Sequence, residues 1–234
     1  MPNSDTVILV AHGQPSDPEP AEDNLARLGR RVQAHLPELR VLTATLATKG
    51  KLEKACQSAG AGVMIYPCFM ARGYFTAQVL PKRLEGMEAT PLPPLGTEPE
   101  LPALVAAYLR AEIRARDWEA SETDLLLAAH GSGRGNKAAE AAYDFITRLT
   151  PLCPVAGIRA GFVEQDPRVK AQAEQSQAPA LCLPFFALEG DHVRSDIRDA
   201  LSEAKFPGAL LPVIADLPGI ERLISQSIRI AART

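Results

Sequence analysis

The sequence has few of the features that mark nucleic-acid binding or a membrane span. Its 25 Lys and Arg residues are outnumbered by 28 Asp and Glu residues, which gives a formal net charge of -3. No Lys/Arg stripe and no interleaving of basic with aromatic residues suggests a nucleic-acid surface, so we expect no nucleic-acid partner. A membrane helix needs about 18 consecutive apolar residues, and no segment is that long, so we expect no membrane partner either.

Cysteine is also scarce. Cys56, Cys68, Cys153 and Cys182 lie far apart and form no Cys-x-x-Cys pair. This spacing excludes the zinc and iron–sulfur sites that are built from paired cysteines. Scattered thiols are usually buried as small hydrophobic side chains. The first residues contain neither a basic region nor an apolar stretch of signal-peptide length, so we expect a protein of the reducing cytoplasm.

Three blocks of sequence occur twice, in the same order, in the two halves of the chain. VILVAHG at 7–13 resembles LLLAAHG at 125–131, YPCFMARGYF at 66–75 resembles LPFFALEGDH at 183–192, and LPPLGTEPEL at 92–101 resembles LPVIADLPGI at 211–220. One match between apolar segments can arise by chance, but three in order indicate a tandem duplication. We therefore expect an N-terminal lobe, 1–118, and a C-terminal lobe, 119–234, joined in the polar stretch near 112–123.

Each half alternates short apolar strands with helical stretches. In the C-terminal half we expect strands near 124–129, 155–162, 179–186 and 208–214, and helices near 136–149, 167–177, 193–204 and 218–232. The N-terminal half has matching strands near 6–11, 40–46, 62–68 and 89–95. Apolar strands separated by helices are typical of parallel sheets covered on both faces. The predicted fold is α/β, with two similar doubly wound lobes and a binding cleft between them.

Ionisable residues follow three of the strands expected in the C-terminal half. His130 follows the first strand, Glu164 the second and His192 the third. Ligands bind beyond the carboxyl ends of parallel strands, so we expect these three side chains to converge at one edge of one sheet. The sequence therefore predicts a His–Glu–His cluster in the C-terminal lobe.

The N-terminal copy of this cluster is degenerate. His12 occupies the position of the first histidine, whereas Ala47 and Phe75 stand where the glutamate and the second histidine would be. Each residue of the C-terminal set has an ordinary alternative, because a histidine at a strand end can be a hydrogen-bonded structural residue and a glutamate can cap a helix. Their expected convergence favours a functional role.

Two neutral imidazoles and a carboxylate suit late divalent ions such as Co, Ni, Fe or Zn. Free imidazole titrates at about pH 6.5, so a histidine side chain can also accept a proton at physiological pH. Other chemistries lack their motifs. The segment GSGRGNKA at 131–138 has neither a phosphate-loop spacing nor a G-x-G-x-x-G match, and no G-x-S-x-G elbow supplies a serine nucleophile. Metal or proton chemistry is the remaining interpretation.

The segments LLLAAHGSGRG, GFVEQDPRV and LPFFALEGDHVRSDI resemble the class II tetrapyrrole chelatases of the CbiX/SirB type, the sirohydrochlorin cobaltochelatases and ferrochelatases. The resemblance covers essentially the whole chain, and its most specific part is the Gly-x-His-Val-x-x-Asp-Ile string at 190–197. It implies a chelatase-like fold of two flavodoxin-like lobes with a tetrapyrrole in the cleft. His130, Glu164 and His192 match the family's His, Glu and His positions, although two-domain members usually carry the set in the N-terminal half.

The resemblance implies an enzyme, a metal-chelatase lyase that inserts Co²⁺ or Fe²⁺ into sirohydrochlorin or a close tetrapyrrole in cobalamin or siroheme synthesis. His130, Glu164 and His192 would be the catalytic and metal-binding residues. Each histidine would be a nitrogen ligand or the base, and Glu164 would add charge and accept or relay protons. No tightly bound cofactor is expected, since Co²⁺, Fe²⁺ or Ni²⁺ is a substrate. The alternative is a non-catalytic tetrapyrrole or metal carrier that uses the same cleft. Either a monomer or a homodimer is compatible with two lobes in one chain.

The carboxylates of such a substrate need hydrogen-bond donors. Gly131 and Ser132 belong to a loop of small residues expected at a helix N-terminus, which is a ready anion site. Arg134, Arg194 and, in the first half, Arg72 are the expected side-chain partners, with a solvated surface charge as the alternative for each. Three aromatic residues are candidates for an apolar wall against the macrocycle, with core packing as the alternative: Phe69, Tyr74 and Phe75.

Overall fold

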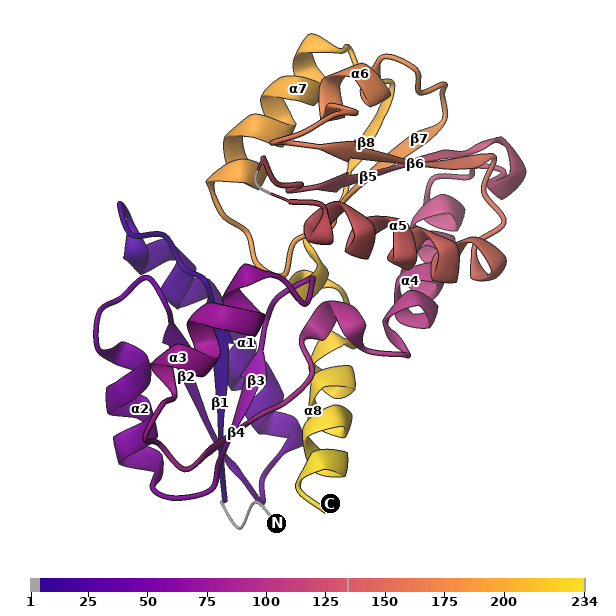
Figure 1. Cartoon of the computed structure of the whole chain (residues 1–234). Helices are drawn as coiled ribbons and strands as arrows, with labels where there is room; N and C mark the ends of the chain where they lie inside the picture. The colour runs from indigo at the N-terminus through magenta and orange to yellow at the C-terminus, as the bar shows by residue number, and fades with distance from the viewer. Residues whose placement is uncertain (1–4, 134, 234) are drawn as a thin grey trace. The chain divides into compact units, whose positions relative to one another are not determined.

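Two compact units make up the computed structural model, which describes residues 5–133 and 135–233. The first unit contains the chain up to Glu98 and from Gly219 onward, and the second is Pro99–Pro218. Each unit contains a four-stranded parallel sheet with helices on both faces (Figure 1). The predicted α/β class with two similar lobes is confirmed.

The sheet of the first unit has the strand order β2-β1-β3-β4. Its strands are β1 (Thr6–Ala11), β2 (Arg40–Thr45), β3 (Val63–Pro67) and β4 (Ala89–Pro91), and its helices are α1 (Pro18–His35), α2 (Lys51–Ala59), α3 (Leu80–Arg83) and α8 (Ile220–Ala231). Side chains alternate between the two faces of a strand. Ile8 and Val10 of β1 therefore face the same way, and they pack with Leu52 of α2 and Leu80 of α3 in one apolar cluster.

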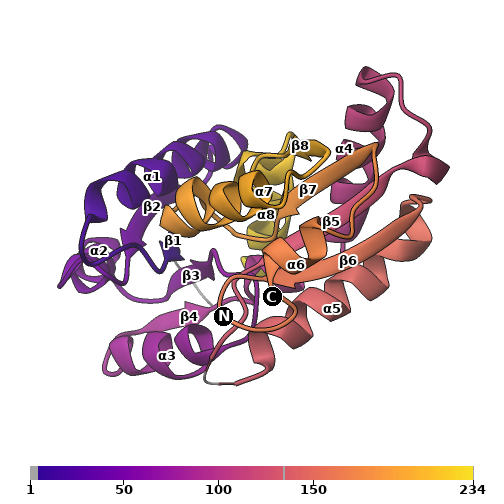
Figure 2. The ribbon, with the colours of Figure 1, turned by 90° about the horizontal axis from the view of Figure 1, so that it is seen from above.

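The second unit repeats this arrangement with the order β6-β5-β7-β8. Its strands are β5 (Asp124–Ala129), β6 (Gly157–Phe162), β7 (Ala180–Pro184) and β8 (Gly208–Leu210), and its helices are α4 (Leu101–Ala115), α5 (Lys137–Leu149), α6 (Val169–Ala173) and α7 (Arg198–Glu203). Leu126 and Ala128 of β5 pack with Val169 of α6 and Leu201 of α7. Helix α6 lies along β6 (Figure 2). In both units a π-helical turn follows the third strand, at Phe75–Val79 and at His192–Ile197.

The packing units differ from the predicted lobes 1–118 and 119–234 in the place of the last helix of each repeat. The last helix of the first repeat, α4, belongs to the second unit, and the last helix of the second repeat, α8, belongs to the first unit. Helix α4 packs against α5, and α8 packs against α1. The Arg229 Nε donates to Glu38 Oε1 at 2.8 Å, which joins α8 to the end of α1. The chain crosses between units at Pro99 and at Pro218, two prolines that occupy equivalent places in the repeat.

Several predicted elements are shorter than the sequence pattern indicates, among them the strand expected near 89–95, which ends at Pro91. The helix expected near 167–177 ends at Ala173, and the Gln177 backbone N–H then donates to Asp124 Oδ2 at 3.0 Å. The strand expected near 208–214 ends at Leu210, shortly before Pro212, which has no N–H to add to the sheet.

All four cysteines are free and buried, as their spacing predicted. Burial raises the pKa of the Cys68 thiol to about 12. None of the helices in the described part of the chain is both long and apolar enough to cross a membrane.

Candidate metal centre

A histidine followed by a left-handed glycine ends the first strand of both units. Gly131 has φ +71°, and a Cβ on it would lie 2.7 Å from Gln165 Cγ. Gly13 has φ +75°, and a Cβ there would lie 2.7 Å from Thr45 Cβ. A residue other than glycine is strained at such a φ and would also collide with Gln165 in the second unit or with Thr45, the last residue of β2, in the first. The turn requires the glycine in both copies, and in the second unit His130 also contacts the turn, because its Nδ1 lies 3.1 Å from the Gly131 carbonyl oxygen.

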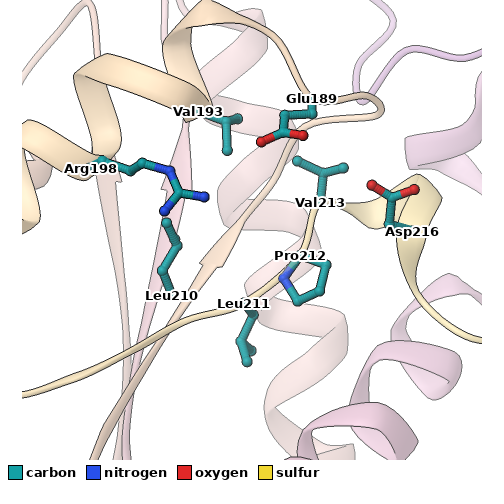
Figure 3. A pocket seen from close by; sticks show the side chains of 8 residues that line it. All are labelled: Glu189, Val193, Arg198, Leu210, Leu211, Pro212, Val213 and Asp216. Atoms are coloured by element: carbon teal, nitrogen blue, oxygen red, sulfur yellow. The ribbon is translucent and has the colours of Figure 1, made fainter. Parts of the chain in front are cut away.

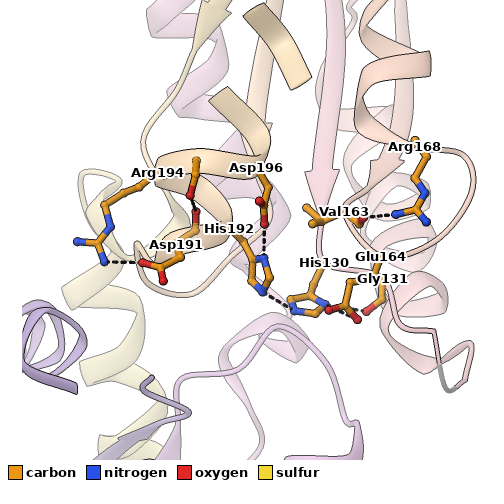
Figure 4. A network of polar contacts seen from close by, with 10 residues as sticks. His130, Gly131, Val163, Glu164, Arg168, Asp191, His192, Arg194 and Asp196 are labelled. Carbon is orange, nitrogen blue, oxygen red and sulfur yellow. Dashed lines mark hydrogen bonds and ion pairs between the residues drawn. The ribbon is translucent and has the colours of Figure 1, made fainter. Parts of the chain in front are cut away.

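The structure brings His130, Glu164 and His192 together at the carboxyl edge of the second sheet (Figure 4). One ligand atom from each lies within 4.8 Å of the others. The Nε2 atoms of the two histidines are 3.0 Å apart, and Glu164 Oε2 is 3.7 Å from His130 Nδ1. The side chains are 42%, 47% and 40% exposed in sequence order, so a ligand can reach them. The predicted convergence of the three is confirmed.

The separation of the two Nε2 atoms limits the geometry of an ion that both would bind. With metal–nitrogen bonds of about 2.0–2.1 Å, nitrogens 3.0 Å apart subtend an angle of about 90° at the metal. This angle fits neighbouring positions of an octahedral or square arrangement better than a tetrahedral one. Two such ligands and one carboxylate leave the remaining positions of a six-coordinate ion open. The site can therefore hold an ion and still present it to another set of ligands.

Asp196 is a further member of the site to which sequence reasoning assigned no role. His192 begins the π-helical turn, and its Nδ1 lies 2.6 Å from Asp196 Oδ2. A carboxylate accepts a hydrogen bond here, so Nδ1–H donates and the Nε2 of a neutral ring keeps its lone pair. The available sequence signal was the His-x-x-x-Asp spacing, which places both side chains on one helix face.

The cluster borders a groove of about 530 Å³ in the second unit. Glu164 and His192 line it, together with Asp196 and two basic residues, Arg168 and Lys170. Both basic residues have partners, because Arg168 Nη1 donates to the Val163 carbonyl and Lys170 Nζ lies 2.9 Å from Glu203 Oε2. The two basic side chains are therefore engaged locally, and the groove places the carboxylates of Glu164 and Asp196 beside His192.

A smaller cavity of about 260 Å³ lies elsewhere in the same unit (Figure 3). Acidic Glu189 and Asp216, the guanidinium of Arg198 and the apolar Val193 and Val213 line it. Among the described residues around it there is no histidine. It therefore offers no ligand set like that of the groove.

The residues predicted to bind substrate carboxylates have more local partners than expected. The Ser132 backbone N–H donates to Gln165 Oε1 at 2.8 Å. Helix α5 begins at Lys137, so Gly131 and Ser132 lie in the loop that leads to its N-terminus, and their binding of a substrate anion stays a prediction. Arg194 Nη2 lies 3.1 Å from Asp191 Oδ1.

Two further arginines were predicted to bind these carboxylates. Arg72 is exposed in the first unit. Arg134 lies outside the described residues.

The equivalent place in the first unit holds an aromatic cluster instead. The His12 ring lies 4.0 Å, between centroids, from Phe75, and Phe75 is 6.1 Å from Phe69 and 5.5 Å from Tyr74. Phe69 and Phe75 also pack on the core of this unit, whereas Tyr74 is 63% exposed.

The backbone confirms how the two repeats align at this edge. The Ala47 N–H donates to the His12 carbonyl at 2.8 Å, just as the Glu164 N–H donates to the His130 carbonyl at 2.9 Å. Among the residues that the structure describes, the first unit has no comparable metal-ligand set.

Both the sequence and the structure are similar to those of known proteins. The model of the CbiX family matches residues 6–112 and again residues 124–231. The structure of CbiX from denitrifying bacteria, described as the terminal enzyme for biosynthesis of siroheme, is 40% identical with a TM-score of 0.88, over 97% of this chain and 99% of that chain. No curated protein matches the chain.

More distant solved structures share the fold. SirB from Bacillus subtilis with Fe³⁺ is 14% identical with a TM-score of 0.75, over 97% of this chain and 95% of that chain. DR2241 from Deinococcus radiodurans, a multi-domain protein with structural similarity to chelatases, is 22% identical with a TM-score of 0.70, over 94% of this chain and 53% of that chain.

Proposed function

The chain belongs to the CbiX family, and we propose that it is a metal chelatase that inserts a divalent ion into sirohydrochlorin or a closely related tetrapyrrole. The observation that carries the proposal is the cluster of His130, Glu164 and His192, whose ligand atoms lie within 4.8 Å of one another. A relative that is 40% identical over nearly the whole chain and is described as an enzyme of siroheme biosynthesis supports the choice of substrate.

The reaction exchanges one divalent cation for two pyrrole protons. The incoming ion must lose water and must be held on one face of the macrocycle while the ring nitrogens replace its remaining ligands. His130 and His192 bind it through Nε2 atoms 3.0 Å apart, which keeps both nitrogens on one side of the ion. The opposite positions stay open to the pyrrole nitrogens, because the three protein ligands are each about half exposed.

Glu164 supplies negative charge to the metal site and accepts the protons that the macrocycle releases. Its carboxylate lies next to the imidazole pair, where it attracts the dication before insertion. As the metal leaves for the macrocycle, the same carboxylate accepts a pyrrole proton and releases it to water, since its side chain is 47% exposed. Each turnover repeats this transfer for the second proton, so two protons leave for each ion inserted.

The metal is a substrate of this reaction, held transiently. Co²⁺ and Fe²⁺ are the proposed ions, in a pathway to cobalamin or to siroheme. Imidazole and carboxylate ligands bind both, because affinity for nitrogen and oxygen ligands rises along the late first-row series whichever ion the pathway uses. Arg194 is proposed to bind a substrate carboxylate by exchanging its exposed partner Asp191. We propose the same role for Arg134 and Arg72, and loop contacts to the substrate for Gly131 and Ser132.

The test is an anaerobic optical assay that follows the sirohydrochlorin spectrum with Co²⁺, Fe²⁺ or Ni²⁺ in turn. We expect catalytic turnover that is lost in His130→Ala and Glu164→Gln. His12→Ala is the matched control, because it removes the equivalent strand-end histidine of the first unit and should leave the rate unchanged. If the spectrum shows only stoichiometric binding that does not depend on Glu164, the protein is a carrier and the enzyme proposal fails.

A further inference from the structure

We propose that Asp196 is a positioning residue that fixes His192 in the tautomer and orientation a metal ion needs; the proposal rests on the metal-binding function above. The His192 Nδ1 lies 2.6 Å from Asp196 Oδ2, on the side of the ring away from the Nε2 that faces His130. Because the carboxylate accepts a hydrogen bond from Nδ1–H, the lone pair of the neutral ring is on Nε2. That is the atom directed at the other ligands (Figure 4).

The surroundings of His192 explain why it needs such a partner. Its side chain is 40% exposed at the start of a helical turn, so core packing does not enclose the ring. It touches the His130 ring edge-on, at 4.4 Å between centroids, and the Phe186 ring at 6.3 Å. Asp196 is itself half exposed, and its bond to Nδ1 adds an anchor one turn along the same helix. A ligand held at both ends of its ring loses less conformational entropy when the metal binds.

The first unit shows what happens to this position when the ligand is absent. Gly73 pairs with Gly190 in the repeat, so Phe75 occupies the place of His192 and Val79 the place of Asp196. Both replacements lie in a π-helical turn, and both pack against the apolar core of the first unit. The turn therefore forms without the carboxylate. The aspartate is absent from the same copy that lacks the histidine, as expected if it serves the ligand and not the fold.

Loss of Asp196 should put the proton on the wrong nitrogen. In water the neutral histidine side chain prefers the tautomer with hydrogen on Nε2, the nitrogen proposed here to bind metal. Without the carboxylate, His192 must shift its proton before it can bind. Removing such an outer partner of a metal ligand typically costs 10–100-fold in metal affinity.

The experiment compares Asp196→Ala, Asp196→Asn and the control Asp199→Asn in the full-length protein. Asp199 lies in the same groove and its replacement removes the same charge, but it is not the partner of His192. Long-range ¹H–¹⁵N spectra of the metal-free protein report the tautomer of His192. Co²⁺ titration without tetrapyrrole reports affinity.

We expect an Nδ1–H ring in the wild type and in Asp199→Asn. In Asp196→Ala we expect an Nε2–H ring and a roughly 10–100-fold weaker Co²⁺ affinity. Asp196→Asn should keep most of the wild-type Co²⁺ affinity, since the amide oxygen can accept the same hydrogen bond.

An unchanged His192 tautomer and an unchanged Co²⁺ affinity in Asp196→Ala would overturn the proposal. An equal loss of Co²⁺ affinity in Asp199→Asn would also overturn it, because the effect would then come from the charge of the groove. Failure of the proposed function looks different, since normal Co²⁺ binding without any insertion into sirohydrochlorin leaves the role of Asp196 intact.

Discussion

Replacing Glu164 with glutamine removes one charge from the metal site and keeps its shape. The three ligand atoms lie within 4.8 Å of one another, so an ion between them sits at most about 4 Å from the carboxylate. Two unit charges at that distance interact by about 1 kcal/mol in water, and a dication doubles this to about 2 kcal/mol. Since Glu164 is 47% exposed, the water-like value applies, and it is a lower limit if the carboxylate binds the ion directly. We therefore expect at least a roughly 30-fold weaker Co²⁺ affinity.

The assay is anaerobic calorimetric titration of the metal-free protein with Co²⁺. Asp166→Asn is the matched control, because it removes the same charge from the same loop at a side chain that is 92% exposed and paired with Arg168. Its affinity should change by less than about threefold. Equal affinities for wild type and Glu164→Gln would refute the assignment of Glu164 as a ligand, and equal losses in both variants would show a long-range charge effect.

Three further results follow from local contacts. Gly131→Ala should lower stability by at least about 1–2 kcal/mol because of its φ of +71°, whereas Gly133→Ala, with open space around it, should have a urea midpoint close to that of the wild type. Hydrogen bonding from Arg83 lowers the pKa of Glu53, so this pair stabilises the fold at neutral pH and loses its contribution as the pH falls below the ordinary carboxyl value of 4.5. Glu53→Gln should therefore lower the thermal midpoint at neutral pH, and a loss that persisted in acid would contradict this. Because burial raises the pKa of Cys68 to about 12, a thiol reagent at mildly alkaline pH should modify it only after denaturation, and rapid labelling of the native protein would contradict its burial.

The convergence of the three ligands was predictable because it depends on local features of the sequence. Each of the three ligands follows a separate apolar strand, and parallel strands place the residues beyond their carboxyl ends at one edge of the sheet. His130, Glu164 and His192 could be assigned in this way before the structure was known. The same argument correctly assigned the degenerate copy, with Ala47 and Phe75 in the first unit.

Other parts of the site depend on contacts that no periodic pattern contains. The apolar face of α4 shows that the helix is buried, but the face does not indicate which sheet it belongs to. Asp196 has the i,i+4 spacing that places two side chains on one helix face, but the spacing does not show that this pair forms a hydrogen bond, which the structure has at 2.6 Å. The donor expected at Ser132 is occupied because Gln165, a residue of the next loop, reaches its N–H.

Each repeat contributes its last helix to the unit formed mainly by the other repeat, and this reverses the order in which the two units can be completed during synthesis. All of Pro99–Pro218, the unit that carries the metal ligands, is made before α8 (Ile220–Ala231). The N-terminal unit, although translated first, must wait for α8 to cover α1. Domains generally fold as units while the chain emerges. We therefore expect the unit with the metal ligands to fold while the N-terminal unit still lacks α8. At that stage the N-terminal unit should depend most on chaperones.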